Sequence, residues 1–181
     1  AFSMCTECRK YYPEFRVSIN LSYVQILKSP LMMELKQIID HSGISCSGII
    51  VELTESGYLE GTPAVRSVWN DMKQLRIQIA LDDFGTGYSN LMNISNLEPD
   101  IVKLDRGFTL KALSRSYEYQ LMQYVIEMVH KLNQYVCVEG VETKEDLEKI
   151  KALGPDLIQG YYYSKPCSRD EFLKKFFGYS E

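Results

Sequence analysis

The residues best suited to chemistry are two adjacent carboxylates, Asp82 and Asp83, which follow the apolar run 77–81 and precede a glycine-containing turn. Two negative charges side by side at the end of a buried strand are costly unless a cation neutralises them. The alternative is an N-cap pair for the following helix, which accounts for one aspartate but not for both. The sequence therefore predicts a metal site here.

Lys103 is the second residue whose setting suggests chemistry. It lies between Val102 and Leu104 in an otherwise apolar run, and it shares one face of its strand with Ile101 and Asp105. A solvated surface lysine is the alternative. A buried ammonium needs anions beside it, so we expect carboxylates around Lys103.

These residues belong to a set of polar side chains that end short apolar segments. Strands are predicted over 15–20, 49–54, 77–82, 101–105, 135–139 and 157–159. Helices are predicted over 22–41 (interrupted before Pro30), 63–75, 117–132, 143–153 and 170–177. The polar residues at the strand ends are Asn20, Glu52, Glu55, Asp82, Asp83, Lys103, Asp105, Glu139 and Gln159.

Alternation of strands and helices predicts an α/β fold with a parallel sheet. Both a doubly wound sheet and a closed barrel place ligands at the carboxyl ends of the strands. A barrel brings every strand end to one mouth, whereas an open sheet brings together only those near its switch point. Polar residues at all six ends therefore favour a TIM-like (β/α) barrel.

The barrel is expected to be incomplete at the amino terminus. An eight-stranded barrel takes about 250 residues, and this chain has 181, which we assign to a single domain, 1–181. Residues 4–12 look like the end of a helix with no strand before them. The strand over 15–20 would then have an unpaired edge, so we expect the isolated chain to dimerise or to leave the side of the barrel open.

Composition excludes other classes of protein. The net charge of −4 argues against DNA binding through phosphate contacts. The five cysteines are an odd number, which is typical of reduced thiols in the cytoplasm. Cys5 and Cys8 form a C-x-x-C, but we interpret them as one face of a helix, because no second pair has zinc-site spacing. No apolar run is long enough to span a membrane, although the parent protein could still be membrane-attached.

Five blocks of the chain resemble, in order and spacing, the signature blocks of EAL domains, bacterial phosphodiesterases that act on cyclic di-GMP. They are preceded by Ser-Ile-Asn-Leu-Ser at 18–22. The blocks are 51–56 (Val-Glu-Leu-Thr-Glu-Ser), 81–89 (Leu-Asp-Asp-Phe-Gly-Thr-Gly-Tyr-Ser), 102–105 (Val-Lys-Leu-Asp), 138–143 (Val-Glu-Gly-Val-Glu-Thr) and 159–166 (Gln-Gly-Tyr-Tyr-Tyr-Ser-Lys-Pro).

The resemblance implies a barrel with two divalent cations, Mg²⁺ or Mn²⁺, at the carboxyl ends of its strands. It also implies a set of metal ligands, with Asp82 as the bridge between the ions. The implied ligands are Asn20, Glu52, Asp82, Asp83 and Glu139. Oxygen donors of this kind suit hard cations.

Other roles follow from the same resemblance. Lys103 would orient or activate the attacking water, with Asp105 supporting the site beside it and Gln159 and Glu139 as further catalytic groups. Glu55 would organise the loop over 83–90, which the family also links to homodimerisation.

One family feature is missing. The Glu-Ala-Leu block, whose glutamate is a metal ligand in the family, has no counterpart before Asn20, where the only acids are Glu7 and Glu14. The chain is therefore interpreted as a truncated or naturally shortened EAL domain. Its parent is expected to carry further signalling domains and to hydrolyse cyclic di-GMP to linear pGpG. The alternative is a catalytically inactive module that binds cyclic di-GMP or has a regulatory role.

Overall fold

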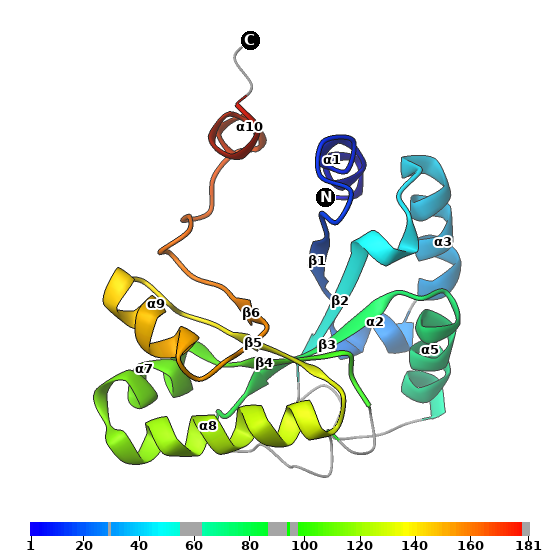
Figure 1. Ribbon diagram of the computed structural model, residues 1–181. Helices are drawn as coiled ribbons and strands as arrows, with labels where there is room; N and C mark the ends of the chain where they lie inside the picture. The colour runs from blue at the N-terminus through cyan, green and yellow to red at the C-terminus, as the bar shows by residue number, and fades with distance from the viewer. Residues whose placement is uncertain (29, 55–62, 87–93, 95–97, 179–181) are drawn as a thin grey trace.

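The protein is a curved parallel sheet with helices on both sides (Figure 1). The structure, a computed structural model, describes residues 1–28, 30–54, 63–86, 94 and 98–178. Its six strands pair in chain order and all neighbours are parallel. They are β1 (Val17–Asn20), β2 (Ile49–Thr54), β3 (Gln78–Phe84), β4 (Ile101–Leu104), β5 (Tyr135–Val138) and β6 (Leu157–Ile158).

Helices follow the strands in the order expected for a (β/α) barrel. α2 (Tyr23–Lys28), α3 (Leu31–Ser42) and α5 (Pro63–Gln74) flank the first three strands. α7 (Arg106–Ser114), α8 (Ser116–Lys131) and α9 (Lys144–Lys151) flank the last three. Within the described residues β1 and β6 are the two edges of the sheet. The predicted fold class, a TIM-like barrel that is incomplete, is confirmed.

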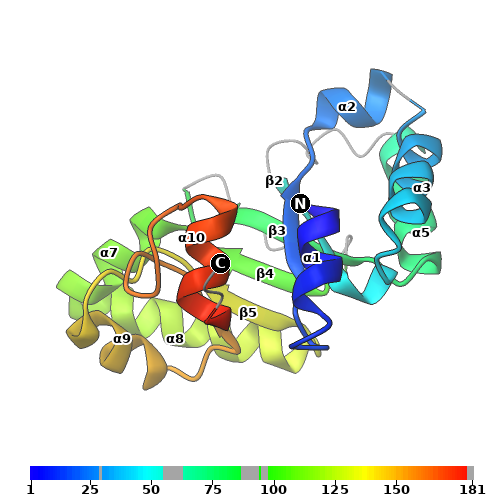
Figure 2. The same cartoon turned by 90° about the horizontal axis from the view of Figure 1, so that it is seen from above.

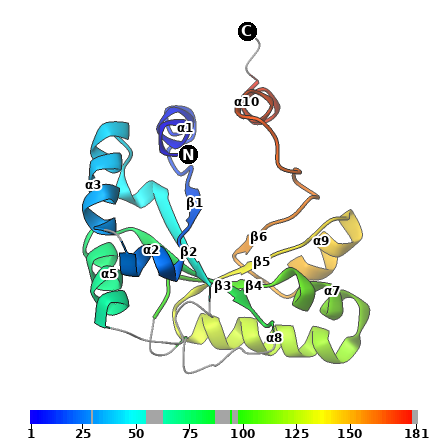
Figure 3. The same cartoon turned by 180° about the vertical axis from the view of Figure 1, so that it is seen from behind.

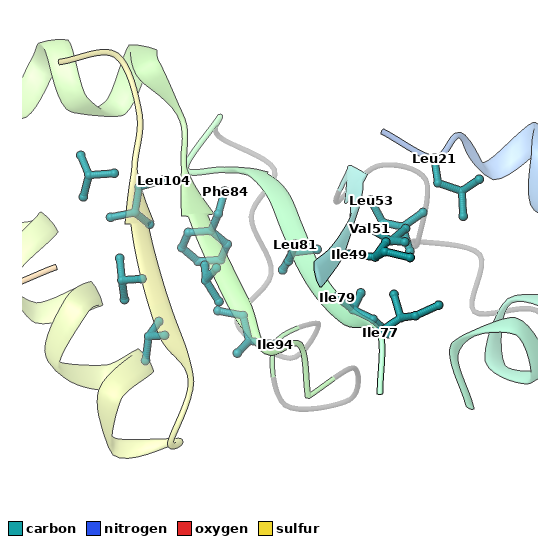
Figure 4. Packing of buried hydrophobic residues seen from close by; sticks show 14 of the residues in the cluster. Leu21, Ile49, Val51, Leu53, Ile77, Ile79, Leu81, Phe84, Ile94 and Leu104 are labelled. Atoms are coloured by element: carbon teal, nitrogen blue, oxygen red, sulfur yellow. The ribbon is translucent and has the colours of Figure 1, made fainter. Parts of the chain in front are cut away.

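The helix-facing side of the sheet forms the main core. Alternate residues of each strand point to this side, and Ile49, Val51, Ile79 and Leu81 are at most 1% exposed (Figure 4). Each fully buried side chain of this kind contributes about 1.5–3 kcal/mol. Near-continuous apolar strands are what a parallel sheet covered by helices requires.

The opposite, concave side carries a smaller apolar cluster. Its members are Ile50, Ala80, Ile101 and Cys137, one from each of the four central strands. We call these four residues the floor, because the charged residues described below lie two residues further along the same strands or their continuation.

Two short loops that share a Pro-Asp pattern fix the register between neighbouring strands. Pro99-Asp100 precedes β4, and Pro155-Asp156 precedes β6. The Asp100 carboxylate accepts a hydrogen bond from Ile79 N–H at 2.8 Å, and Asp156 accepts one from Val136 N–H at 2.8 Å. Each aspartate also donates its own N–H to the carbonyl of the same partner residue. The pattern therefore fixes how β4 follows β3 and how β6 follows β5.

The two ends of the chain meet over the concave side of the sheet. α1 (Phe2–Cys8) and α10 (Arg169–Phe177) both lie on the side away from α8 (Figures 2 and 3). Phe15 contacts Phe172 and Phe177 edge to face, at centroid distances of 6.0 and 6.2 Å. Arg169 and Glu7 form an ion pair between the two helices.

Several predicted elements differ in extent from the observed ones. β1 begins at Val17 rather than at residue 15, and β4 ends before Asp105 because that residue caps α7. The sequence analysis did not predict α7 at all. α1 ends at Cys8 rather than at residue 12, with Cys5 and Cys8 buried on one face as predicted. Across the described part of the chain, no helix has the length and apolarity needed to cross a membrane.

Candidate active site

Four charged side chains form a rim above the floor. Each stands two residues beyond a floor residue on the same strand or its continuation, so it points to the same side of the sheet. The pairs of floor and rim residues are Ile50 and Glu52, Ala80 and Asp82, Ile101 and Lys103, and Cys137 and Glu139. The fold thus converts an alternation in sequence into a charged layer at the carboxyl ends of the central strands.

Lys103 lies at the centre of this rim. Its Nζ is 2.8 Å from Glu52 Oε2, 2.9 Å from Asp82 Oδ1 and 2.6 Å from Glu139 Oε1. Lys103 is 5% exposed and Glu52 is 8% exposed. The prediction that Lys103 needs anions beside it is therefore confirmed, and the partners come from three different strands or strand ends.

Burial and charge act in opposite directions on these groups. Burial by itself lowers the pKa of Lys103, but the hydrogen bonds that it donates to the three carboxylates raise it, and the net direction is upward. Burial raises the pKa of Glu139, which the Lys103 ammonium only partly offsets. The ammonium is therefore the stable form of Lys103, and it faces an excess of carboxylates.

A β-bulge places Asp83 next to this rim. The pairing of β3 with β4 steps from Leu81–Val102 to Phe84–Leu104, so β3 contains one extra residue. Asp83 has a φ of 61°, a left-handed conformation that aspartate adopts more readily than most residues. Desolvation and then the nearby charges of Asp82 and Asp105 raise the pKa of Asp83. Both adjacent carboxylates therefore belong to one acidic region.

Two glycines allow the loops around the rim to pack closely. Gly85 has a φ of 103°, and a Cβ there would lie 2.8 Å from the Phe108 ring. A Cβ on Gly160 would lie 2.0 Å from the carbonyl oxygen of Val141, so any side chain would push the loop after β6 away from the loop after β5. Both glycines lie in the quoted signature blocks.

The remaining predicted residues either lie at the border of the rim or are outside the residues that the structure describes. Asn20 is exposed at the end of β1, in register with Glu52. Asp105 caps α7, and its Oδ1 accepts a hydrogen bond from Gly107 N–H at 2.8 Å. Gln159 is exposed just after β6. Glu55 and residues 87–90 of the predicted loop lie outside the described residues.

A cavity of about 590 Å³ extends from the rim over the floor. Glu52 and Lys103 line it, together with the four floor residues, and Phe172 and Phe176 of α10 contribute to its wall. Cys137 is the residue that the sequence analysis overlooked here, although its position two residues before Glu139 would have indicated it. Burial raises the pKa of the Cys137 thiol to about 12, so it remains protonated.

The donor set suits a hard cation. Three carboxylates from separate strands converge on one point, and Lys103 neutralises only one of their charges. Within the described residues, no group of three or more acidic, histidine or cysteine side chains is arranged to hold an ion as it stands. The residues therefore fit a divalent cation in chemistry and charge, with Lys103 at their meeting point.

Comparison with protein families and with curated proteins points to EAL domains and to cyclic di-GMP phosphodiesterases, respectively. The family model for the EAL domain matches residues 1–166. Cyclic di-GMP phosphodiesterase PdeF of Escherichia coli K12 is 32% identical over 160 residues, which are 88% of this chain and 21% of PdeF. This chain spans about a fifth of the length of the first curated relatives that it matches.

Solved structures agree with the sequence comparison. The EAL domain of Mycobacterium smegmatis DcpA superimposes with a TM-score of 0.89 at 26% identity, covering 98% of this chain and 81% of that structure. A phosphodiesterase structure titled PaMucR, in complex with c-di-GMP, gives a TM-score of 0.85 at 26% identity, covering 95% of this chain and 70% of that structure. With the family model matching nearly the whole chain, this protein belongs to the EAL domain family.

Proposed function

We propose that this domain hydrolyses one phosphodiester bond of cyclic di-GMP, giving linear pGpG, with the help of two divalent cations, Mg²⁺ or Mn²⁺. The observation that carries the proposal is the convergence of Glu52, Asp82 and Glu139 on Lys103 at the carboxyl ends of the strands. Family membership supplies the substrate and the reaction.

The acidic residues would hold the cations. We assign Glu52, Asp82 and Glu139, together with the neighbouring Asp83 and the border residue Asn20, as metal ligands. Cations bound there would lower the pKa of a coordinated water and offset the charge of the phosphate. Without a counter-cation the rim would repel a dianionic substrate, so the excess of carboxylates is itself an argument for cations.

The other polar residues would act on the water and the phosphate. Lys103 would orient the attacking water and oppose the negative charge that develops on the phosphate. Asp105 would support the rim from the start of α7, and Gln159 would provide a further polar contact. The organising role of Glu55 for the loop over 83–90 stays a prediction, as do a homodimer, further domains in the parent protein and a cytoplasmic location.

The test is turnover of cyclic di-GMP by this chain with Mg²⁺ or Mn²⁺. Asp82→Asn and Glu52→Gln should each lower kcat by about 100-fold or more, because even the groups that only support a metal ligand are worth about 10–100-fold. Asp40→Asn in α3 and Glu148→Gln in α9 are matched controls on exposed helix positions and should keep the rate.

Two results would contradict the proposal in different ways. Equal rates in all variants would remove Asp82 and Glu52 from the mechanism. Tight binding of cyclic di-GMP without hydrolysis would instead favour the inactive, regulatory module.

A further inference from the structure

The ammonium of Lys103 has no donor left for any other partner. A lysine ammonium carries three N–H donors, and Nζ lies within 2.9 Å of three carboxylate oxygens, one each from Glu52, Asp82 and Glu139. In this arrangement Lys103 cannot also donate to a water or to a phosphate. If it acts on either, it must first give up at least one of the three carboxylates.

The same three contacts explain how the rim folds. Three carboxylates gathered around one point repel each other strongly, because little water reaches them to screen their charges. A buried charge without a partner is costly. Lys103 Nζ is within hydrogen-bond distance of all three. Its neighbours Val102 and Leu104 are fully buried in the main core on the other side of the sheet, so their packing fixes the stretch of β4 from which the ammonium projects.

Lys103 does not balance the negative charge of the three carboxylates, so a divalent cation would also be attracted to the rim. With all four groups ionised, the three carboxylates and one ammonium carry an excess of two negative charges. Divalent cations prefer the same hard oxygen donors that Lys103 now holds. A cation entering the rim therefore meets carboxylates that are already gathered but are engaged by the ammonium.

We propose that Lys103 is an exchangeable counter-cation: it holds Glu52, Asp82 and Glu139 together, and it releases at least one of them to an incoming divalent cation. In this role Lys103 is a positioning residue for the ligand set, and release gives its ammonium a free donor. The exchange rests on the proposed function only for the identity of the cation. The role in holding the carboxylates together depends on the ion pairs alone.

Thermal unfolding of the full chain tests this inference without measuring activity. Lys103→Met should lower Tm by about 6–15 °C in the presence of a chelator, because it leaves buried carboxylates without their partner. Titrated Mn²⁺ should then raise Tm more in Lys103→Met than in the wild type, since the cation replaces the lost charge. Lys111→Met, at an exposed position in α7, is the matched control and should change neither value.

Each outcome decides the question. A Lys103→Met variant that is unfolded in chelator but folds on addition of Mn²⁺, followed by circular dichroism, supports the exchange. The exchange is overturned if Mn²⁺ raises Tm equally in both proteins, if the variant is as stable as the wild type in chelator, or if it stays unfolded at every Mn²⁺ concentration. A wild type with no turnover but with the expected difference in Tm would contradict the proposed function and leave this inference intact.

Discussion

Asp83 combines two features that reduce stability. Its backbone has a φ of 61°. The pKa of its carboxyl is raised, mainly by desolvation and further by the negative charges of neighbouring carboxylates. Neither feature helps the sheet to fold. Both follow from the bulge in β3, which adds a second acidic side chain beside the rim. Strain and like charge together at one position are typical of functional sites.

Asp83→Asn should stabilise the protein in the absence of divalent cations. A raised pKa means that the folded state binds more protons than the unfolded state between the ordinary value of 3.8 and the raised value. Stability therefore falls as pH rises through that window, and the asparagine variant avoids this fall. Because Asp83 is exposed, solvent screening limits the gain in Tm at pH 7 to about 1–3 °C.

The measurement is Tm against pH for both proteins in chelator. The advantage of Asp83→Asn should shrink as pH falls through 3.8 and vanish well below it, where the wild-type carboxyl is protonated in both states. An advantage that is constant with pH would show that charge is not its cause. Asn also tolerates a positive φ, so the backbone is not the variable.

At the scale of elements, Asp100 shows how a side chain sets the register of strands. Its carboxylate accepts the N–H of Ile79, a residue that is completely buried. Asp100→Ala leaves that N–H without its acceptor, which costs about 1–3 kcal/mol and should lower Tm by about 3–10 °C. Differential scanning calorimetry measures the loss.

Two controls separate this hydrogen bond from a general effect of losing an aspartate. Asp100→Asn keeps an acceptor oxygen and should recover most of the stability. Asp40→Ala, at an exposed position in α3, should leave Tm within about 1 °C, as expected for surface substitutions. If Asp100→Asn is as unstable as Asp100→Ala, the bond to Ile79 is not the reason.

Within the described residues, the sequence alone located all six strands but did not predict α7, and both results have physical reasons. Apolar runs that end in a polar residue are a strong signal, so every end of the six strands lies within two residues of its predicted position. α7 was missed because it starts directly after β4, and its N-cap, Asp105, had been assigned to the site alone. Asp105 does both: it caps α7, and its charge contributes to the raised pKa of Asp83.

The site was only partly predictable for a related reason. Spacing along the chain identified Glu52, Asp82, Lys103 and Glu139, and the need of a buried lysine for anions was clear. Lys103 meets all three carboxylates because of the register between four strands. That register cannot be predicted from any local sequence pattern. The bulge at Asp83 is likewise a property of the pairing of β3 with β4.

At the scale of the whole molecule, the ends of the chain join across the concave side. Phe172 of α10 contacts Phe15 before β1, so the helix also forms part of the cavity wall above the floor. Phe172→Ala should loosen α10 without disturbing the main core on the helix-facing side of the sheet. We expect hydrogen exchange of the amides over 169–177 to speed up by about 10-fold or more, which corresponds to about 1.4 kcal/mol of local stability.

Exchange in β2 and β3 is the internal reference for that experiment and should stay unchanged. Lys174→Ala, an exposed position on α10, is the matched control. Uniform acceleration throughout the sheet would mean that Phe172 supports global stability, and no change in α10 would mean that its contact with Phe15 has no role in docking the helix.

The central claim is that side chains from separate strands form one cation-binding centre around Lys103. Anomalous diffraction at the manganese edge, from crystals of this chain soaked in Mn²⁺, tests it most directly. We predict ion density at about 2.1 Å from carboxylate oxygens of Glu52 and Asp82, with Lys103 Nζ withdrawn from at least one of its present partners. Crystals with no anomalous peak at the rim, and with all three carboxylates still on Lys103, would contradict it.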